Sequence, residues 1–254
     1  MLYFIGLGLN KEQLSLEAVN TLKSCNKIYL EAYTSNYTEN NINALEKQLN
    51  IKFIKLYRED VEQGFSKIIL EAKEKDICFC VFGNITSATT HASIINEAKE
   101  AKVKIKQIPG ISIFSVIPML TGLEEYRFGR TVSIVKPLDN YKPKSFFEYI
   151  LQNKKIGLHT ICLLDIKIEK NKKYYMQPYE ATLRLLEIAK EKNIETKDWQ
   201  IYVISGACSK KENVFISNLK EISQMKTNYD YPTSLVITGK LTYDEKENQK
   251  HILK

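Results

Sequence analysis

Three loops rich in glycine and small polar residues follow apolar segments in the first half of this chain. They have the sequences GLGLN (6–10), GNITSATT (83–90) and PGISI (109–113). Each comes where a predicted buried strand ends, and open α/β sheets bind ligands beyond the carboxyl ends of their strands. Glycine at such positions lets the backbone approach a ligand closely. The loops predict a ligand site, although helix capping by Thr86 or Ser87 explains the second loop equally well by itself.

The same loops exclude two common phosphate motifs. GLGLN lacks the third glycine of the dinucleotide fingerprint, and GNITSATT lacks the Gly-Lys-Ser/Thr ending of a phosphate-binding loop. The three histidines are far apart and form no metal-ligand pair of the i, i+4 kind. We expect His91 and His159 to be hydrogen-bonded structural residues. Asp165 interrupts a long apolar run, as a site residue at a strand end or as a hydrogen-bond anchor.

The remaining chemistry is one in which the protein mainly binds and orients its reactants. Methyl transfer from S-adenosylmethionine is such a reaction, because the sulfonium already carries its leaving group and needs alignment and desolvation. No nucleophile elbow is present in the sequence. A site made of backbone and small side chains fits this requirement.

The elements that would position the loops alternate between strand and helix patterns. Strands are predicted at 2–9, 27–33, 51–57, 77–82 and 103–108. Helices are predicted from Leu14, after a cap at Asn43, over Val61–Ala72 and over 88–101. This alternation predicts a parallel sheet with right-handed crossovers.

The second half has a different pattern. Strands are predicted at 131–135, 159–168, 199–205 and 233–239, with helices at 146–151, 181–192 and 219–225 and a lysine-rich loop over 164–178. Pro118 and Gly122 indicate a nearby domain boundary. We therefore expect an N-terminal α/β domain over 1–115 and a C-terminal α/β domain over 116–254.

Composition narrows the possible partners. The 254 residues carry a net charge of +7, but the basic residues are spread over predicted surfaces, which favours a solvated lysine-rich surface over a nucleic-acid site. The charge could still favour an acidic partner protein. The five cysteines are scattered, which is typical of reduced thiols, and no apolar run approaches the ~20 residues of a membrane span. We expect a cytoplasmic protein without metal, membrane or nucleic-acid partners.

Several segments together resemble one family. They are MLYFIGLGLN (1–10), YLEAYTS (29–35), REDVEQ (58–63), GNITSATTH (83–91), PGISI (109–113), YRFGRTVSIV (126–135) and GLHTICLLDIK (157–167). This set resembles diphthine synthases, the methyltransferases of diphthamide biosynthesis, within the wider superfamily of tetrapyrrole (corrin and porphyrin) methylases. Weaker similarity continues at 178–189 and 233–241.

The resemblance implies a fold, a cofactor and a partner. It implies a parallel-sheet N-terminal domain and a mixed-sheet C-terminal domain, with S-adenosylmethionine in the cleft between them, and a homodimer. The substrate would be translation elongation factor 2 with a 3-amino-3-carboxypropyl group on a histidine. Its amine would be methylated repeatedly, to the trimethylammonium form in the archaeal type that PGISI and the short segment 167–200 resemble.

The resemblance also implies which positions contact S-adenosylmethionine, mostly through backbone groups, and it assigns no catalytic residue. The positions are Leu9, Asn84, Ser87, Ser112, Ile113, Leu164, Cys208 and Thr233. Two of them depart from the family, which usually has Gly-Asp-Pro where this chain has Gly-Asn-Ile and a histidine near Thr233. Loss of the Asp charge beside a cationic cofactor should weaken its binding by about 1 kcal/mol.

Groups that would contact the substrate remain open at this point. Tyr33 with Tyr37, or Tyr126 with Phe128, could face a quaternary ammonium, although core packing explains them as well. Arg127 and Arg130 are both candidates for the substrate carboxylate. Two alternatives also remain: methylation of a tetrapyrrole or other small molecule by the same fold, and an inactive module that binds S-adenosylmethionine.

Overall fold

The computed structural model describes residues 1–37, 42–87, 91–138, 140–169 and 172–252. The chain divides into two compact units, Met1–Ile113 with Ile166–Lys173, and Phe114–Asp165 with Tyr174–Lys254. This division places the segment Ile166–Lys173 with the first unit, whereas a single domain boundary near residue 115 would place it with the second. Within the described ranges, the helices are too short or too polar to cross a membrane.

The first unit contains a five-stranded sheet in the order β3-β2-β4-β1-β5, and every pair of neighbours is parallel. Its strands are β1 (Leu2–Gly6), β2 (Lys27–Glu31), β3 (Ile54–Leu56), β4 (Ile77–Val81) and β5 (Ile105–Ile108). Its helices are α1 (Leu16–Ser24), α2 (Ile42–Leu49), α3 (Arg58–Glu62), α4 (Phe65–Glu71) and α5 (His91–Glu100). The predicted parallel α/β arrangement is confirmed.

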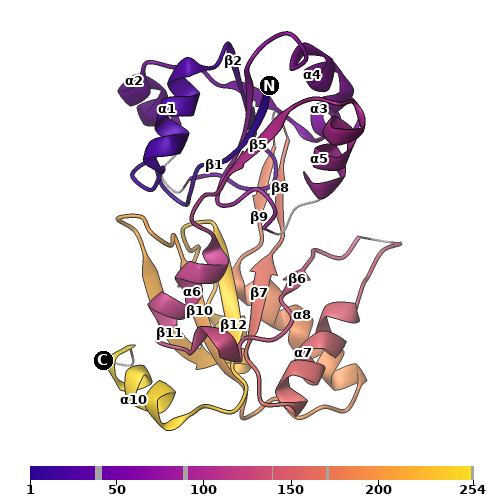
Figure 1. The fold of residues 1–254 in the computed structure, drawn as a ribbon. Helices are drawn as coiled ribbons and strands as arrows, with labels where there is room; N and C mark the ends of the chain where they lie inside the picture. The colour runs from indigo at the N-terminus through magenta and orange to yellow at the C-terminus, as the bar shows by residue number, and fades with distance from the viewer. Residues whose placement is uncertain (38–41, 88–90, 139, 170–171, 253–254) are drawn as a thin grey trace. The chain divides into compact units, whose positions relative to one another are not determined.

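Helices cover both faces of this sheet, with α1 and α2 on one side and α3, α4 and α5 on the other (Figure 1). Phe4 and Phe79 pack into the cluster under α3–α5, whereas Cys78 and Cys80 pack into the cluster under α1 and α2. Side chains alternate along a strand, so a strand covered on both faces is apolar at every position. This explains why β4 is buried throughout.

Two helix predictions in the first unit need correction. The pattern over Val61–Ala72 forms two helices, since α3 ends at Glu62 and α4 begins after Gly64. Glycine is a poor helix former, which explains the interruption. Asn43 lies inside α2 and is not its cap. The predicted helix at 88–101 is observed as α5 from His91, and residues 88–90 lie outside the described ranges.

The second unit has a mixed sheet in the order β11-β10-β12-β7-β6, as the resemblance implied. Only β6 and β7 are parallel among its paired strands in the described ranges. The strands are β6 (Val132–Ile134), β7 (Thr160–Leu164), β10 (Gln200–Ser205), β11 (Asn213–Asn218) and β12 (Thr233–Ile237). One face packs in a large core against α7 (Ser145–Lys155), α8 (Pro178–Glu191) and α9 (Leu219–Gln224).

Several elements near this sheet differ from the prediction. The strand expected over 159–168 ends at Leu164, and β8 (Ile166–Ile168) pairs with β9 (Lys173–Tyr175) in a separate hairpin, so the lysine-rich region is not simply a loop. Pro118 lies inside a helix, α6 (Ile113–Thr121). Strand β11 and helix α10 (Tyr243–Ile252) were not predicted, because the apolar stretch of β11 is short and α10 is largely polar.

Candidate functional site

The first two glycine loops join at the carboxyl ends of β1 and β4. Gly8 N–H donates to the Gly83 carbonyl at 3.1 Å, and Gly83 N–H donates back to the Gly8 carbonyl at 2.8 Å. Both glycines have positive φ, at +70° and +72°. A side chain other than glycine would strain this reciprocal pair, since L residues rarely adopt that conformation.

The third loop packs against the other two through backbone and short side chains. Gly110 N–H donates to Asn84 Oδ1 at 3.3 Å, and the Ser112 hydroxyl donates to Ser87 Oγ at 3.0 Å. A Cβ on Gly110 would lie 2.2 Å from the Gly83 carbonyl oxygen, so no larger residue fits. The structure therefore brings the three loops together at one end of the sheet, as predicted.

The five predicted positions of the first unit all belong to these loops. Leu9, Asn84, Ser87, Ser112 and Ile113 are each half-buried, neither core residues nor free surface. Leu9 N–H donates to Gln13 Oε1 at 2.8 Å, which fixes the loop after β1. A cluster of half-buried neutral groups at strand ends is the arrangement of a ligand site rather than of a packed core.

The three predicted positions of the second unit also gather at one end of their own sheet. Thr233 is the first residue of β12 and pairs with Ser205, the last residue of β10. Leu164 is the last residue of β7, next to the residue that pairs with Ser234. Cys208 follows β10 with a φ of +61°, and its N–H donates to Glu212 Oε2 at 2.7 Å.

Two histidines are buried and hydrogen-bonded, as expected. His91 Nδ1 donates to the Ile85 carbonyl at 3.0 Å. His159 Nδ1 accepts from Gly239 N–H at 3.0 Å, so its Nε2 carries the proton and donates to Glu245 Oε1 at 2.9 Å. His159 and Glu245 are fully buried. Both histidines hold structure within their own unit.

Burial sets the protonation of the His159–Glu245 pair. Burial lowers the pKa of His159, even though Glu245 favours the charged imidazolium. Burial alone would raise the pKa of Glu245, but hydrogen bonds from Thr242 N–H, His159 and Glu124 N–H outweigh it and lower that pKa. The pair is therefore a neutral imidazole that donates to a carboxylate.

Asp165 serves as a hydrogen-bond anchor between strand ends. Its carboxylate accepts from Lys136 N–H at 3.0 Å, its own N–H donates to the Ile134 carbonyl, and its carbonyl accepts from Met176 N–H. These bonds fix the turn of the chain between β7 and β8. Of the two sequence-based interpretations, the anchor has direct support.

Tyr126 is exposed, whereas the other predicted aromatic and arginine candidates make contacts within the fold. Tyr37 is buried and donates to the Leu7 carbonyl at 2.7 Å, and Phe128 packs edge-on against His159. Arg127 donates to the Gly157 carbonyl at 3.3 Å, and Arg130 lies 3.6 Å over the Tyr149 ring.

Sequence reasoning missed an aromatic stack in the second unit. Tyr175 and Tyr231 have ring centroids 3.6 Å apart, and Tyr231 precedes Thr233 by two residues. The two tyrosines are distant in sequence, and no periodic pattern joins them.

Comparison with known proteins identifies a family and relatives that match most of this chain. The model of a family described as tetrapyrrole (corrin/porphyrin) methylases matches residues 1–223. A diphthine synthase of Methanocaldococcus jannaschii is 37% identical over 99% of this chain and 98% of its own length. A diphthine methyl ester synthase of Kluyveromyces lactis is 32% identical over 96% of this chain and 87% of its own. A crystal structure of a putative diphthine synthase from Entamoeba histolytica superposes with a TM-score of 0.89, at 26% identity, over 100% of this chain and 98% of that one.

The family model and the relatives identify a methyltransferase. The chain belongs to the tetrapyrrole methylase family, and it is an enzyme that uses S-adenosylmethionine as methyl donor. The loops of the first unit fit that group, because amide, hydroxyl and backbone groups surround Gly83, where a Cβ would meet only Leu9 and the Ile111 carbonyl at ordinary contact distance. Neutral polar groups suit a cation that has to be desolvated before transfer.

Proposed function

We propose that this methyltransferase makes diphthine: it methylates the amine of the 3-amino-3-carboxypropyl group on a histidine of translation elongation factor 2. The observation that carries the proposal is its similarity, over almost the whole of both chains, to an archaeal protein named diphthine synthase. Diphthamide biosynthesis takes place on a protein, so the partner is a target protein rather than a free tetrapyrrole. The tetrapyrrole alternative has only the breadth of the family in its favour.

Eight residues form the proposed methyl-donor site. Leu9, Asn84, Ser87, Ser112 and Ile113 contribute from the first unit, and Leu164, Cys208 and Thr233 from the second. The support is their position at the carboxyl ends of β1, β4 and β5 and at one end of the mixed sheet. When bound, S-adenosylmethionine supplies a methyl group on a sulfonium that leaves as a neutral thioether.

The residues of the chain would supply positioning and exclusion of water. The Asn84 side chain ties the second loop to the backbone of the third, and the Ser87–Ser112 bond joins them again. These bonds hold the loop backbones in place before any ligand arrives, so little ordering is needed on binding. The acceptor amine has to arrive neutral, which burial away from water favours.

The number of methyl groups separates two related products. The relative from Kluyveromyces lactis is named for diphthine methyl ester, and its carboxylate ester requires one methyl more than diphthine. The archaeal relative matches over a larger share of its own length. This supports diphthine, with three methyl groups on nitrogen, as the product of this chain.

Two further expectations belong to the proposal: a cytoplasmic location, where elongation factor 2 acts, and a homodimer. The second unit offers support for the homodimer, since Met119, Tyr126 and Tyr243 are exposed by 68%, 82% and 77%. Their elements are tied together by the hydrogen bonds of Asn248 to Gly122 and of Glu124 to Glu245. Sedimentation of wild type and Met119→Glu tests this expectation, and a wild-type monomer would contradict it.

The activity test is methyl transfer with a defined substrate. Labelled S-adenosylmethionine is incubated with the enzyme and with elongation factor 2 that carries the unmethylated side chain. We expect label in the elongation factor, and none when the modified histidine is replaced by alanine. Label transferred to a tetrapyrrole but not to the elongation factor would favour the alternative, and S-adenosylmethionine binding without transfer to either would indicate an inactive module.

A further inference from the structure

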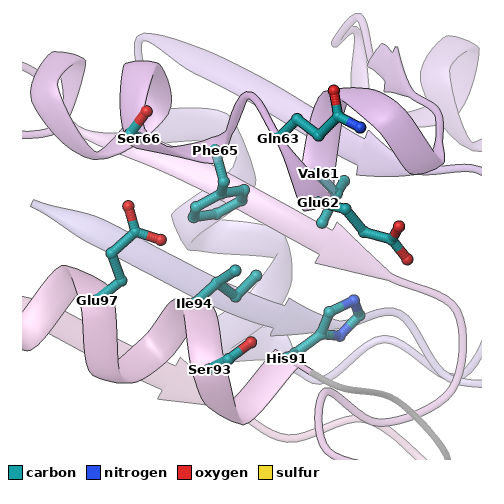
Figure 2. A pocket seen from close by; sticks show the side chains of 9 residues that line it. All are labelled: Val61, Glu62, Gln63, Phe65, Ser66, His91, Ser93, Ile94 and Glu97. Atoms are coloured by element: carbon teal, nitrogen blue, oxygen red, sulfur yellow. The ribbon is translucent and has the colours of Figure 1, made fainter.

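A pocket of about 270 Å³ lies between α3, α4 and α5, on one face of the first sheet. Figure 2 shows Glu62 and His91 at one end of this pocket and Glu97 at the other. Glu62 is paired with Arg58 at 3.0 Å, His91 is hydrogen-bonded to the Ile85 carbonyl, and Glu97 is exposed. The polar groups of this pocket therefore serve the fold or face solvent.

Two cysteines meet on the opposite face of the same sheet, under α1. Cys25 directly follows α1, and Cys78 is the second residue of β4. Both bond to one backbone group: the Cys25 N–H donates to the Thr21 carbonyl at 3.1 Å, and the Cys78 thiol donates to the same carbonyl at 4.0 Å. The Cys78 thiol is also within hydrogen-bonding reach of the Cys25 sulfur. The two sulfur atoms are therefore neighbours, although the residues are distant in sequence.

The two thiols differ in their access to solvent and in their acidity. Cys25 is half-buried, whereas Cys78 is fully buried. A hydrogen bond from the Cys78 thiol lowers the pKa of Cys25, and burial opposes this effect only in part. The same bond, together with burial, raises the pKa of Cys78 far above its usual range. Cys25 is thus the thiol that ionises, and Cys78 stays protonated beside it.

We propose that Cys25 and Cys78 form an oxidation site that reacts with hydrogen peroxide and closes to a disulfide. A thiolate is the nucleophilic form of cysteine, and a half-buried one beside a second thiol is the arrangement of redox-sensitive pairs. The pair needs no further residue of the chain, because the peroxide is the oxidant and the second thiol resolves the intermediate.

The reaction has two balanced steps. The Cys25 thiolate attacks one peroxide oxygen, the O–O bond breaks and hydroxide leaves, so that Cys25 becomes a sulfenic acid. The Cys78 sulfur then attacks the sulfenic sulfur, the S–O bond breaks, and the hydroxyl group leaves as water with the Cys78 proton. The proton that Cys25 lost on ionising converts the hydroxide to water. Two thiols and one peroxide thus give one disulfide and two waters.

The oxidation site lies at the end of the sheet opposite the glycine loops. Cys78 pairs with Tyr3 near the start of β1, whereas the loops follow Gly6 and Val81 at the other ends of β1 and β4. The disulfide would join the end of α1 to β4 and constrain the unfolded chain between them. The site is separate from the methyl-donor loops and does not rest on the proposed function.

Peptide mapping without reduction, after the intact enzyme is treated with hydrogen peroxide and its remaining thiols are alkylated, tests the site. We expect one linked pair of peptides that contain Cys25 and Cys78, lighter than the two free peptides by two hydrogen atoms and separated again by dithiothreitol. Cys25→Ser and Cys78→Ser should each abolish this link. The matched control is Cys80→Ser, which removes another buried thiol from β4 and should keep the link.

Dimedone, which traps sulfenic acids, separates the two steps. In Cys78→Ser the resolving thiol is absent, while the new hydroxyl can still donate to the Thr21 carbonyl, so Cys25 should retain several-fold more dimedone than in wild type. Cys78→Ala should give the same result without a buried hydroxyl.

The half-buried Cys208 sets the scale of oxidation in these experiments, since peroxide is raised until Cys208 reacts. Absence of the Cys25–Cys78 link at that concentration would overturn the proposal. So would a link that forms only between other cysteines, or equal dimedone labelling of Cys25 in wild type and in both Cys78 variants.

Discussion

Gly110 N–H donates to Asn84 Oδ1 across 3.3 Å, and this bond ties the loop after β5 to the loop after β4. Asn84 therefore has a structural partner in addition to its proposed ligand. An aspartate carboxylate could accept the same bond, so the family's usual residue and this chain's residue are interchangeable in the fold. The aspartate adds a negative charge and lacks the two N–H donors of the asparagine amide.

Replacing Asn84 with Asp should tighten S-adenosylmethionine binding about fivefold, because a carboxylate near a sulfonium in a partly solvated site is worth about 1 kcal/mol. Calorimetry measures both dissociation constants. S-adenosylhomocysteine, whose sulfur is neutral, is the control and should gain little. Tighter S-adenosylmethionine binding by wild type than by Asn84→Asp would contradict this prediction.

The packing of the glycine loops predicts that alanine at Gly110 and alanine at Gly83 reduce the free energy of unfolding by different amounts. In Gly110→Ala the new Cβ would meet backbone of Gly83 and Gly6 at 2.2 and 2.5 Å, which cannot move aside. We expect a loss of about 3 kcal/mol in the free energy of unfolding, measured in urea. In Gly83→Ala the space is open and only the positive φ is strained, which costs about 1–2 kcal/mol. Equal losses in the two variants would argue against the close approach.

The Ser87–Ser112 hydrogen bond should couple the two loops during ligand binding. Ser87→Ala and Ser112→Ala should each weaken S-adenosylmethionine binding by about 1 kcal/mol, since each removes the hydrogen bond that joins the two loops. The double variant should be little worse than either single variant, which a double-mutant cycle detects. Strict additivity would mean that the two hydroxyls act independently.

The His159–Glu245 pair predicts acid sensitivity. The folded-state pKa of His159 lies below its unfolded value of about 6.5, so the unfolded chain binds more protons and stability falls as pH drops below that value. The pKa of Glu245 is also lowered in the folded state, so the protein loses further stability when the pH falls low enough to protonate this carboxylate. Urea unfolding of His159→Gln should show lower stability at pH 7 than wild type, but a flatter decline between about pH 6.5 and 5. An equally steep decline in the variant would assign the acid sensitivity to other groups.

The sequence predicted the first sheet well, because strands such as β4 are apolar at every position and lie between clear helix patterns. Predictions failed where elements form through tertiary contacts rather than through a clear local pattern. Strand β11 is only partly buried and is held by its pairing with β10, which no local pattern encodes. Pro118 looked like a boundary, yet it lies within α6, where the proline ring is buried.

The loops of the candidate site could be located from the sequence, since glycine at a predicted strand end indicates a tight turn or a close approach of the backbone. The bonds that order them could not, because Asn84 and Gly110 are distant in sequence and their pairing depends on strand order. The contact between His91 and Glu31 was equally hidden, because it joins the start of α5 to a residue of β2 about sixty residues earlier.

The most direct measurement is the mass of the modified histidine peptide of elongation factor 2 after reaction with this enzyme and S-adenosylmethionine. The account predicts the mass of three added methyl groups, with fragmentation that places all of them on the amine nitrogen. A fourth methyl on the carboxylate would identify the methyl ester as product. A peptide without any added methyl group, under conditions where the enzyme binds S-adenosylmethionine, would contradict the account.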